Sequence, residues 1–231
     1  MKTIALIVAA GSSQRFGGEV PKQFRTVCGR PLLSWTVEKF ERAESIDHIV
    51  IVTAEEYLLH TSQKVVDPYN FNKVTKIVKG GETRRESVIN GLEALPLSTN
   101  FVAIHDGARP LVNPKDIDLV VATAQKERAA ILAQQASDTI KRCAEGFILN
   151  TIDRRILFQA QTPQVFQYDL ILNAHKEALA NDDQSPTDDA LLIEEKGFKV
   201  KIVEPSTPNF KVTTPTDLYL AEKLIERENN E

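Results

Sequence analysis

The 231-residue sequence predicts an α/β fold in which helices cover both faces of a mostly parallel, twisted sheet. Three features support this prediction. Short, continuous apolar runs such as residues 3–8 are typical of strands that are covered on both faces. Segments with helical periodicity alternate with these runs. The strand–helix–strand spacing fits right-handed crossover connections between parallel strands.

The first half of the chain carries this alternation most clearly. The expected strands are residues 3–8, 48–53, 74–78 and 101–105. The expected helices are residues 31–43, 57–66 and 83–95. Pro31 suits a first helical turn, and Pro68 stops the second helix. The third helix begins with a capping box formed by Thr83 and Glu86.

Residues 137–158 break the alternation and predict a projecting β-hairpin, which we name the arm. Two extended stretches flank a turn at 144–146, and the segment has few large apolar residues for a core of its own. An isolated hairpin is marginally stable in water, so the arm is expected to need a partner surface. Beyond it we expect a strand at 199–203 and helices at 168–180, from Thr187 and from Pro215, where Thr214 is the cap. No repeat or clear linker divides the chain, which favours one domain over residues 1–231.

The composition argues against several classes of function. The chain has 28 Lys and Arg against 32 Asp and Glu, a formal net charge of -4, which argues against a general nucleic-acid binder. No stretch approaches the roughly 20 apolar residues of a membrane span. Cys28 and Cys143 form no C-x-x-C pair, which fits a reducing cytoplasm. The first apolar run is short and is read as a strand rather than a signal peptide.

Three polar, glycine-bearing segments follow expected strands. They are AAGSSQRFGG at 9–18, KGGETRRES at 79–87 and HDGARP at 105–110. In parallel sheets, ligands bind at the carboxyl ends of the strands, near the point where the strand order reverses. We therefore expect these segments to meet at one edge of the sheet and to form the site.

The first segment suits a phosphate ligand but matches neither common glycine-rich fingerprint. Gly11 allows a sharp turn, and successive backbone N–H groups there can form an anion-binding nest. Arg15 and Lys22 supply two cations that could reach the same phosphates. The alternative is a surface loop whose two charges are solvated.

The other two segments add groups of different chemistry. Gly80 and Gly81 permit close backbone approach and Ser87 offers a hydroxyl, although a loop before a well-capped helix would look the same. Asp106 ends a buried strand and could hold Mg²⁺ through its hard oxygen atoms, while Arg109 could bind an anionic group. The alternative is a structural Asp106–Arg109 pair. His105 is expected to be packed rather than catalytic.

No motif indicates covalent catalysis. The sequence has no G-x-S-x-G, no H-E-x-x-H and no cysteine–histidine cluster of metal-ligand spacing. What remains is a chemistry of positioning and charge neutralisation, as phosphoryl and nucleotidyl transfers require.

Taken together, six ordered motifs resemble those of the 2-C-methyl-D-erythritol 4-phosphate cytidylyltransferase family. They lie between about Ile4 and Leu220 and read AAGSSQRFG…PKQF, GGETRRES, HDGARP, SDTIKR, QTPQVF and NFKVTTPTDL. The resemblance implies a Rossmann-like nucleotidyltransferase fold and a Mg²⁺-dependent, homodimeric enzyme of non-mevalonate isoprenoid biosynthesis. Methylerythritol phosphate would attack the α-phosphorus of CTP and expel pyrophosphate.

The resemblance also implies roles for individual residues. Arg15 and Lys22 would be catalytic, and Asp106 would hold Mg²⁺. The nucleotide would contact Ala9, Ala10, Gly11, Ser12, Ser13, Lys22, Gly80, Gly81, Ser87 and Asp106. The sugar phosphate would contact Asp106, Arg109, Thr139, Arg154 and Lys211. In the family the arm reaches across the dimer, so Thr139 and Arg154 would complete the partner's site.

Two departures from the family pattern are visible. Some relatives carry an acid shortly before the lysine that matches Lys211, where this chain has Thr207, Pro208 and Asn209. Asp106 is therefore predicted to be the only protein carboxylate on the metal. Gly107 replaces the usual alanine of the HD-x-ARP motif, a change that we expect to be tolerated.

Three other functions remain open. A ribitol-5-phosphate cytidylyltransferase uses the same nucleotide, but its first loop tends to read A-G-G where this chain has Ala9-Ala10-Gly11. A sugar-1-phosphate nucleotidyltransferase usually carries a longer G-x-G-T-R-type loop. A non-catalytic nucleotide-binding module would be expected to have lost at least one of Arg15, Lys22, Asp106 and Lys211.

Overall fold

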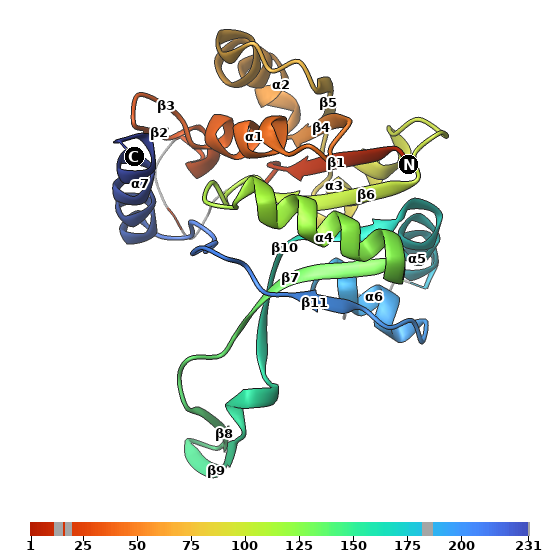
Figure 1. Cartoon of the computed structure of the whole chain (residues 1–231), viewed down its shortest axis with the longest axis vertical. Helices are drawn as coiled ribbons and strands as arrows, with labels where there is room; N and C mark the ends of the chain where they lie inside the picture. The colour runs from red at the N-terminus through yellow and green to blue at the C-terminus, as the bar shows by residue number, and fades with distance from the viewer. Residues whose placement is uncertain (12–15, 17–19, 182–186, 231) are drawn as a thin grey trace.

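A computed structural model describes residues 1–11, 16, 20–181 and 187–230. Within them, seven strands form the central sheet (Figure 1). In sheet order they are β11 (Lys201–Val203), β7 (Ala129–Gln135), β10 (Phe158–Gln167), β6 (Phe101–Asp106), β1 (Thr3–Val8), β4 (His48–Thr53) and β5 (Val74–Lys79). Among these strands only β10 runs antiparallel to its neighbours β6 and β7. The prediction of a mostly parallel sheet is confirmed.

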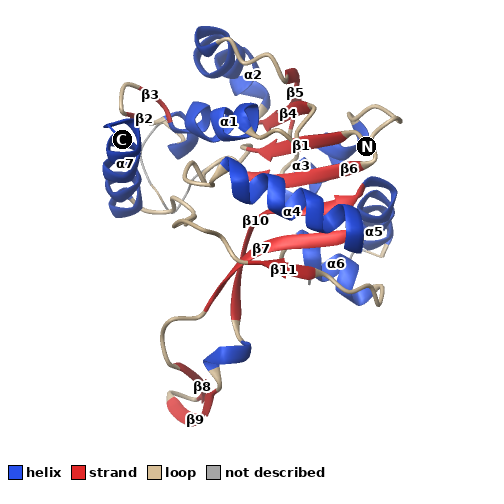
Figure 2. Ribbon diagram, in the orientation of Figure 1, coloured by secondary structure: helices blue, strands red, loops and turns tan. Residues whose placement is uncertain are grey.

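Helices cover both faces of the sheet, as predicted (Figure 2). On one face lie α1 (Leu32–Arg42) and α4 (Pro114–Glu127), and on the other lie α3 (Arg84–Glu93), α5 (Tyr168–Ala180) and α6 (Asp189–Glu195). Neighbouring residues of β1 alternate between the two cores: Ile7 packs with α1 and α4, and Leu6 packs with α3 and α5. A third cluster holds α7 (Pro215–Asn230) against Trp35. None of the described helices is long and apolar enough to cross a membrane.

The sequence prediction missed two adjoining elements, α4 and β7. Asn113 caps α4 by accepting a hydrogen bond from the Lys115 N–H, and Pro114 stands in its first turn. The helix ends at Arg128, which has a left-handed φ of 74°, and β7 begins at the next residue. Because no loop separates helix from strand, the usual turn signals are absent. The polar strand β10, which has a register irregularity between Ala160 and Gln164, was also missed.

Residues 57–66 do not form the single α-helix that was predicted. The segment consists of a 3₁₀ turn (Glu55–Tyr57), a short α2 (Leu58–His60) and a π-helical stretch (Thr61–Val66). Its only fully buried side chains are Thr61 and Val65, so little tertiary packing enforces a regular helix. Further 3₁₀ turns lie at Lys22–Phe24, Asp67–Tyr69 and Arg154–Ile156, and a small two-stranded sheet pairs β2 (Thr26–Val27) with β3 (Arg30–Pro31).

The predicted arm is present as a hairpin that projects from the body of the chain (Figure 1). β8 (Ile140–Ala144) pairs antiparallel with β9 (Phe147–Ile152) through a turn with positive φ at Glu145 (51°) and Gly146 (83°). The arm exposes several apolar side chains. Phe147 is 75% exposed and Leu149 is 58% exposed.

The topology brings the three predicted loops to one edge of the sheet. The loops follow β1, β5 and β6, and the neighbouring strands β6, β1, β4 and β5 are all parallel, so their carboxyl ends lie at the same edge. Val8 at the end of β1 pairs with Asp106 at the end of β6. The chain order reverses between these two strands, which is where ligands bind in open α/β sheets.

His105 is packed at this end of β6, as expected. It is fully buried, and its ring lies 4.7 Å from the Phe40 ring. Its Nε2–H donates to the Arg109 carbonyl (3.1 Å), and its Nδ1 accepts from the Thr162 hydroxyl (3.0 Å). Burial lowers the pKa of His105 to about 3.

This burial predicts a loss of stability in acid. The unfolded imidazole has a pKa of about 6.5, so between that pH and about 3 the unfolded chain binds the extra proton. The free energy of unfolding should then fall as the pH falls, by up to about 1.4 kcal/mol per pH unit from this group. In urea titrations between pH 7 and 4, His105→Gln should show a shallower pH slope than the wild type. Equal slopes for His105→Gln and wild type would contradict the assignment.

Candidate functional site

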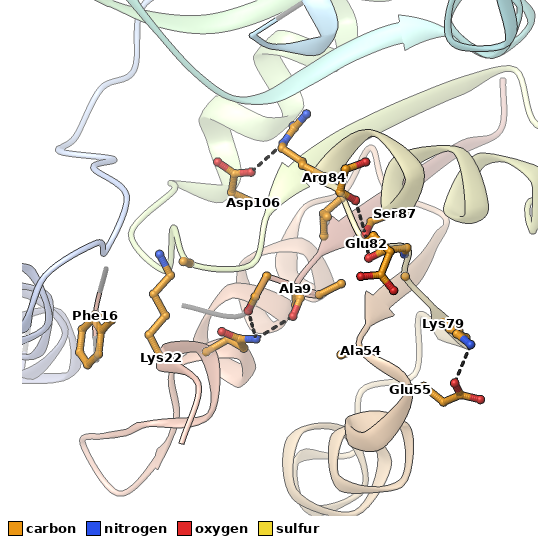
Figure 3. Close-up of a pocket in the computed structure, with 18 of the residues that line it drawn as sticks. Ala9, Phe16, Lys22, Ala54, Glu55, Lys79, Glu82, Arg84, Ser87 and Asp106 are labelled. Carbon is orange, nitrogen blue, oxygen red and sulfur yellow. Dashed lines mark hydrogen bonds and ion pairs between the residues drawn. The ribbon is translucent and has the colours of Figure 1, made fainter. Parts of the chain in front are cut away.

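A cavity of about 890 Å³ opens at the carboxyl ends of β1, β4, β5 and β6 (Figure 3). Its walls come from the three predicted loops, from residues 54–56 after β4, and from Lys211 and Thr213. Of the predicted site residues, the cavity is lined by Ala9, Ala10, Gly11, Lys22, Gly80, Gly81, Ser87, Asp106 and Lys211. Residues far apart in the sequence therefore share one cavity.

The first wall is held in shape by Gln23, which the sequence analysis did not single out. Its side-chain Nε2 donates to the carbonyls of Ala9 (2.8 Å) and Gly11 (3.1 Å), and the residue is 4% exposed. The Ala9 N–H donates to the carbonyl of Val52 at the end of β4 (2.7 Å). These bonds fix the backbone of the loop and leave neighbouring Lys22 lining the cavity. Ser12, Ser13 and Arg15 lie outside the described residues.

The second wall is the turn that leads into α3. The predicted capping box is present, with the Thr83 hydroxyl accepting from the Glu86 N–H. The Ser87 hydroxyl donates to the Thr83 carbonyl (2.9 Å) and accepts from the Gly81 N–H (3.1 Å). A Cβ at Gly80 would lie only 2.4 Å from the Cβ of Ala10, so the two loops meet because residue 80 has no side chain.

Asp106 stands at the centre of a cluster of positive charges. Its carboxylate lies 2.9 Å from Lys211 Nζ, 3.4 Å from Arg84 Nε and 3.6 Å from Arg109 Nε. Burial alone would raise the pKa of Asp106, but Lys211 and Arg84 outweigh it and hold that pKa well below its usual range. The carboxylate is therefore ionised at neutral pH.

Arg109 contacts Asp106 but is not among the residues that line the cavity. Its guanidinium donates to the carbonyl of Asn209 (2.7 Å), and the Asn209 amide donates to the carbonyl of Thr162 (2.8 Å). Burial lowers the pKa of Arg109, and Asp106 partly offsets that effect. The structural Asp106–Arg109 pair considered above thus exists, although it belongs to a larger cluster that also includes Lys211.

The donor set of the cavity fits a hard divalent cation. Asp106 supplies an ionised carboxylate, and Mg²⁺ is commonly held by one or two carboxylates together with substrate phosphates and water. Within the described residues, the three-ligand group of side chains that could hold a metal is Cys28, Glu222 and Glu226, which lies outside this cavity. Lys211 Nζ lies 2.9 Å from Asp106 Oδ2, so a metal ion bound at that oxygen would have to replace Lys211.

The arm residues are not part of this cavity. Thr139 lies just before β8, and the Arg154 guanidinium donates to the carbonyl of Ser137, both on the projecting arm. Within one chain, the structure therefore does not bring Thr139 and Arg154 to Asp106.

Two further polar residues of the site were missed by the sequence analysis. Arg84 appeared there only inside the capping-box motif, and Asp189 was not considered. In the structure Arg84 Nη2 lies 2.7 Å from Asp189 Oδ2 while Nε faces Asp106. The predicted helix start at Thr83 could have indicated Arg84. This helix follows a parallel strand, so side chains in its first turn lie near the carboxyl ends of the strands. No local signal identified Asp189.

A sequence model of the family described as "IspD: 2-C-methyl-D-erythritol 4-phosphate cytidylyltransferase" matches residues 3–227. The chain belongs to this family. Among its relatives, the 2-C-methyl-D-erythritol 4-phosphate cytidylyltransferase of Clostridium acetobutylicum is 45% identical over 224 residues, which are 96% of this chain and 97% of the relative. That of Syntrophotalea carbinolica is 44% identical over 227 residues, 98% of this chain and 97% of the relative.

Solved structures of IspD proteins share the fold. The 4-diphosphocytidyl-2C-methyl-D-erythritol synthase of Anaerococcus prevotii superposes with a TM-score of 0.86 at 28% identity, covering 97% of this chain and 96% of that one. The 2-C-methyl-D-erythritol 4-phosphate cytidylyltransferase of Thermus thermophilus superposes with a TM-score of 0.77 at 31% identity, covering 97% and 98%. The likeness to the IspD family stated from six motifs is confirmed, as is a nucleotidyltransferase fold.

The close contact between Gly80 and Ala10 predicts that a side chain at position 80 will disturb the cavity. In Gly80→Ala the new Cβ would meet Ala10 Cβ at 2.4 Å and Ser87 Oγ at 2.8 Å, so the two loops must separate. We expect a loss of about 1–3 kcal/mol in the free energy of unfolding, measured in urea, with weaker nucleotide binding by calorimetry.

Gly11→Ala is the matched control, because a Cβ at Gly11 meets no atom of the described residues within 4 Å. Its free energy of unfolding should stay within about 0.5 kcal/mol of wild type. Equal stability of Gly80→Ala and wild type would contradict the close packing of the two loops.

Proposed function

We propose that the chain transfers the cytidylyl group of CTP to 2-C-methyl-D-erythritol 4-phosphate. The products would be 4-diphosphocytidyl-2-C-methyl-D-erythritol and pyrophosphate, a step of non-mevalonate isoprenoid biosynthesis. Membership of the IspD family supports the substrates. The observation that carries the chemistry is the convergence of Lys22, Asp106 and Lys211 on one cavity at the ends of β1 and β6.

The reaction brings two polyanions together, so their repulsion must be cancelled. A phosphate oxygen of methylerythritol phosphate attacks the α-phosphorus of CTP while the bond to the bridging oxygen of the pyrophosphate breaks. In this proposal Lys22 and Arg15 stabilise the negative charge that grows on the α-phosphate. The loss of one such contact typically raises the barrier by about 3 kcal/mol, near a hundredfold in rate.

We assign the nucleotide to the cavity between the first and second loops. The backbone of Ala9, Ala10 and Gly11, which Gln23 holds in place, would contact the nucleotide. Ser12 and Ser13 would contact it as well. Gly80, Gly81 and Ser87 would lie near the cytosine and ribose, where the missing side chains of the glycines leave room for the backbone to approach.

Asp106 would be the carboxylate of the protein that binds Mg²⁺. When bound, the ion would supply positive charge to the phosphates of CTP. Asp106 suits this task because it is ionised, reaches the cavity and is fixed by its backbone N–H, which donates to the Thr162 hydroxyl (3.1 Å). Lys211, displaced from the carboxylate, would then be available to the phosphate of the second substrate.

The remaining contacts to the sugar phosphate would come from the arm of a second subunit and from Arg109, which would have to turn from the Asn209 carbonyl into the cavity. Thr139 and Arg154 lie on an arm that exposes Phe147 and Leu149, so we propose a homodimer in which each arm completes the partner's cavity. Both cysteines are free, and with the family membership this supports a cytoplasmic location.

Pyrophosphate release tests the proposed reaction. Purified protein with Mg²⁺ and CTP should release pyrophosphate with methylerythritol phosphate but not with ribitol 5-phosphate or glucose 1-phosphate. Lys22→Ala should lower kcat roughly a hundredfold while CTP binding, measured by calorimetry, changes far less. Release with ribitol 5-phosphate alone would favour the alternative cytidylyltransferase, and no release with any acceptor would favour a binding module.

Mixed subunits test the role of the arm. Lys22→Ala and Arg154→Ala homodimers should both be nearly inactive, because each site lacks one required cation. A hybrid dimer contains one site with both cations, so equal mixing after subunit exchange should restore about a quarter of the wild-type rate. Absence of recovery, with hybrid dimers verified by differential tags, would contradict completion of the site across the dimer.

A further inference from the structure

Arg84 joins two carboxylates that lie 83 residues apart in the sequence, Asp106 and Asp189. It stands in the first turn of α3, and Figure 3 shows its side chain beside Asp106 in the cavity wall. Nε lies 3.4 Å from Asp106 Oδ1, and Nη2 lies 2.7 Å from Asp189 Oδ2. The guanidinium thus uses separate nitrogens for the two carboxylates.

Asp189 is a buried residue outside the cavity lining. It is the first residue of α6 and is 1% exposed. On the side away from Arg84, its Oδ1 accepts a hydrogen bond from His175 Nε2 (3.1 Å), and His175 of α5 is 2% exposed. The carboxylate is therefore held between two helices, with Arg84 as its cationic partner.

The three cations around Asp106 are not equivalent. Lys211 lines the open cavity, and its ammonium has no second carboxylate among the described residues. Besides Asp106, Arg109 contacts the carbonyl of Asn209, which is a neutral group. Arg84 alone of the three contacts a second, fully buried carboxylate, and removing it would leave His175 as the only other side chain that the described part of the chain shows in contact with the buried Asp189 carboxylate.

This difference matters when an anionic substrate enters. In the proposed reaction a substrate phosphate would draw Lys211 away from Asp106, and would draw Arg109 away from both Asp106 and the Asn209 carbonyl, because these contacts can be exchanged for contacts with phosphate oxygens. Arg84 stays in place, since Asp189 holds its other nitrogen. Asp106 then keeps one fixed positive neighbour and one fixed orientation throughout the reaction.

We propose that Asp189 is a positioning residue for nucleotidyl transfer, acting through Arg84 to hold the Asp106 carboxylate in its working orientation. The inference rests on the proposed function, and it adds a residue that touches neither substrate. His175 supports the same link by fixing the other oxygen of Asp189.

Asp189→Asn tests the link with little change in shape. The amide keeps one oxygen but removes the charge that holds Arg84, so Arg84 is released toward Asp106. We expect kcat to fall between roughly 10- and 100-fold, the range found when an outer partner of a ligating group is lost, with the KM for CTP changed less than threefold.

The double variant separates positioning from a general structural effect. If Asp189 acts through Arg84, adding Asp189→Asn to Arg84→Met should produce no further loss of kcat. The double variant removes both charges of the pair together, so its kcat can be compared with that of the wild type even if a single variant fails to fold, and a wild-type kcat in the double variant would overturn the proposal. A further loss equal to the single effect would overturn the proposal.

Asp116→Asn is the matched control. Asp116 is also a carboxylate in the first turn of a helix, is 4% exposed and accepts hydrogen bonds from Ser206, outside the cavity lining. It should lose stability in urea but keep the wild-type kcat. Wild-type kcat in Asp189→Asn would overturn this inference alone, whereas no pyrophosphate release by the wild-type chain would overturn the proposed function itself.

Discussion

The site depends on one constraint: a buried carboxylate at the end of a central strand must be balanced by positive charge. Asp106 is 8% exposed, and an unpaired ionised carboxylate there would be strongly destabilising. The chain meets the constraint with cations from three separate elements, namely Arg84 at the start of α3, Arg109 in the turn after β6 and Lys211 beyond β11. The charge balance therefore ties distant segments to one point, and that point faces the cavity.

The same arrangement serves the chemistry proposed for this IspD protein. A set of cations that neutralises a carboxylate in the free protein can neutralise phosphates when substrates bind, provided that some of the contacts exchange. Lys211 is placed to exchange because it lines the open cavity, and Arg84 is placed to remain because Asp189 anchors it. A net-negative protein can in this way present a locally positive site to two anionic substrates.

The parts of the fold and site that could be predicted are those marked by a short sequence pattern, such as a glycine after an apolar run or a capping box. Glycines after apolar runs located the three loops, and the capping box located α3. The sequence prediction missed α4 and β7 because the chain passes from helix to strand at Arg128 without a loop. It missed Asp189 because that residue matters only through Arg84, which comes from another part of the sequence. Residues 57–66 carry helical periodicity but bury too little surface to enforce a regular helix.

We infer that Lys211 leaves Asp106 when substrates and metal bind, while Arg84 stays. The most direct test is a crystal structure of the protein with CTP and Mn²⁺, in which the metal is located by its anomalous signal. This inference predicts a metal peak on the Asp106 carboxylate, with Lys211 moved away from it and Arg84 still between Asp106 and Asp189. A structure with CTP bound in the cavity, no metal on Asp106 and Lys211 still paired with that carboxylate would contradict it.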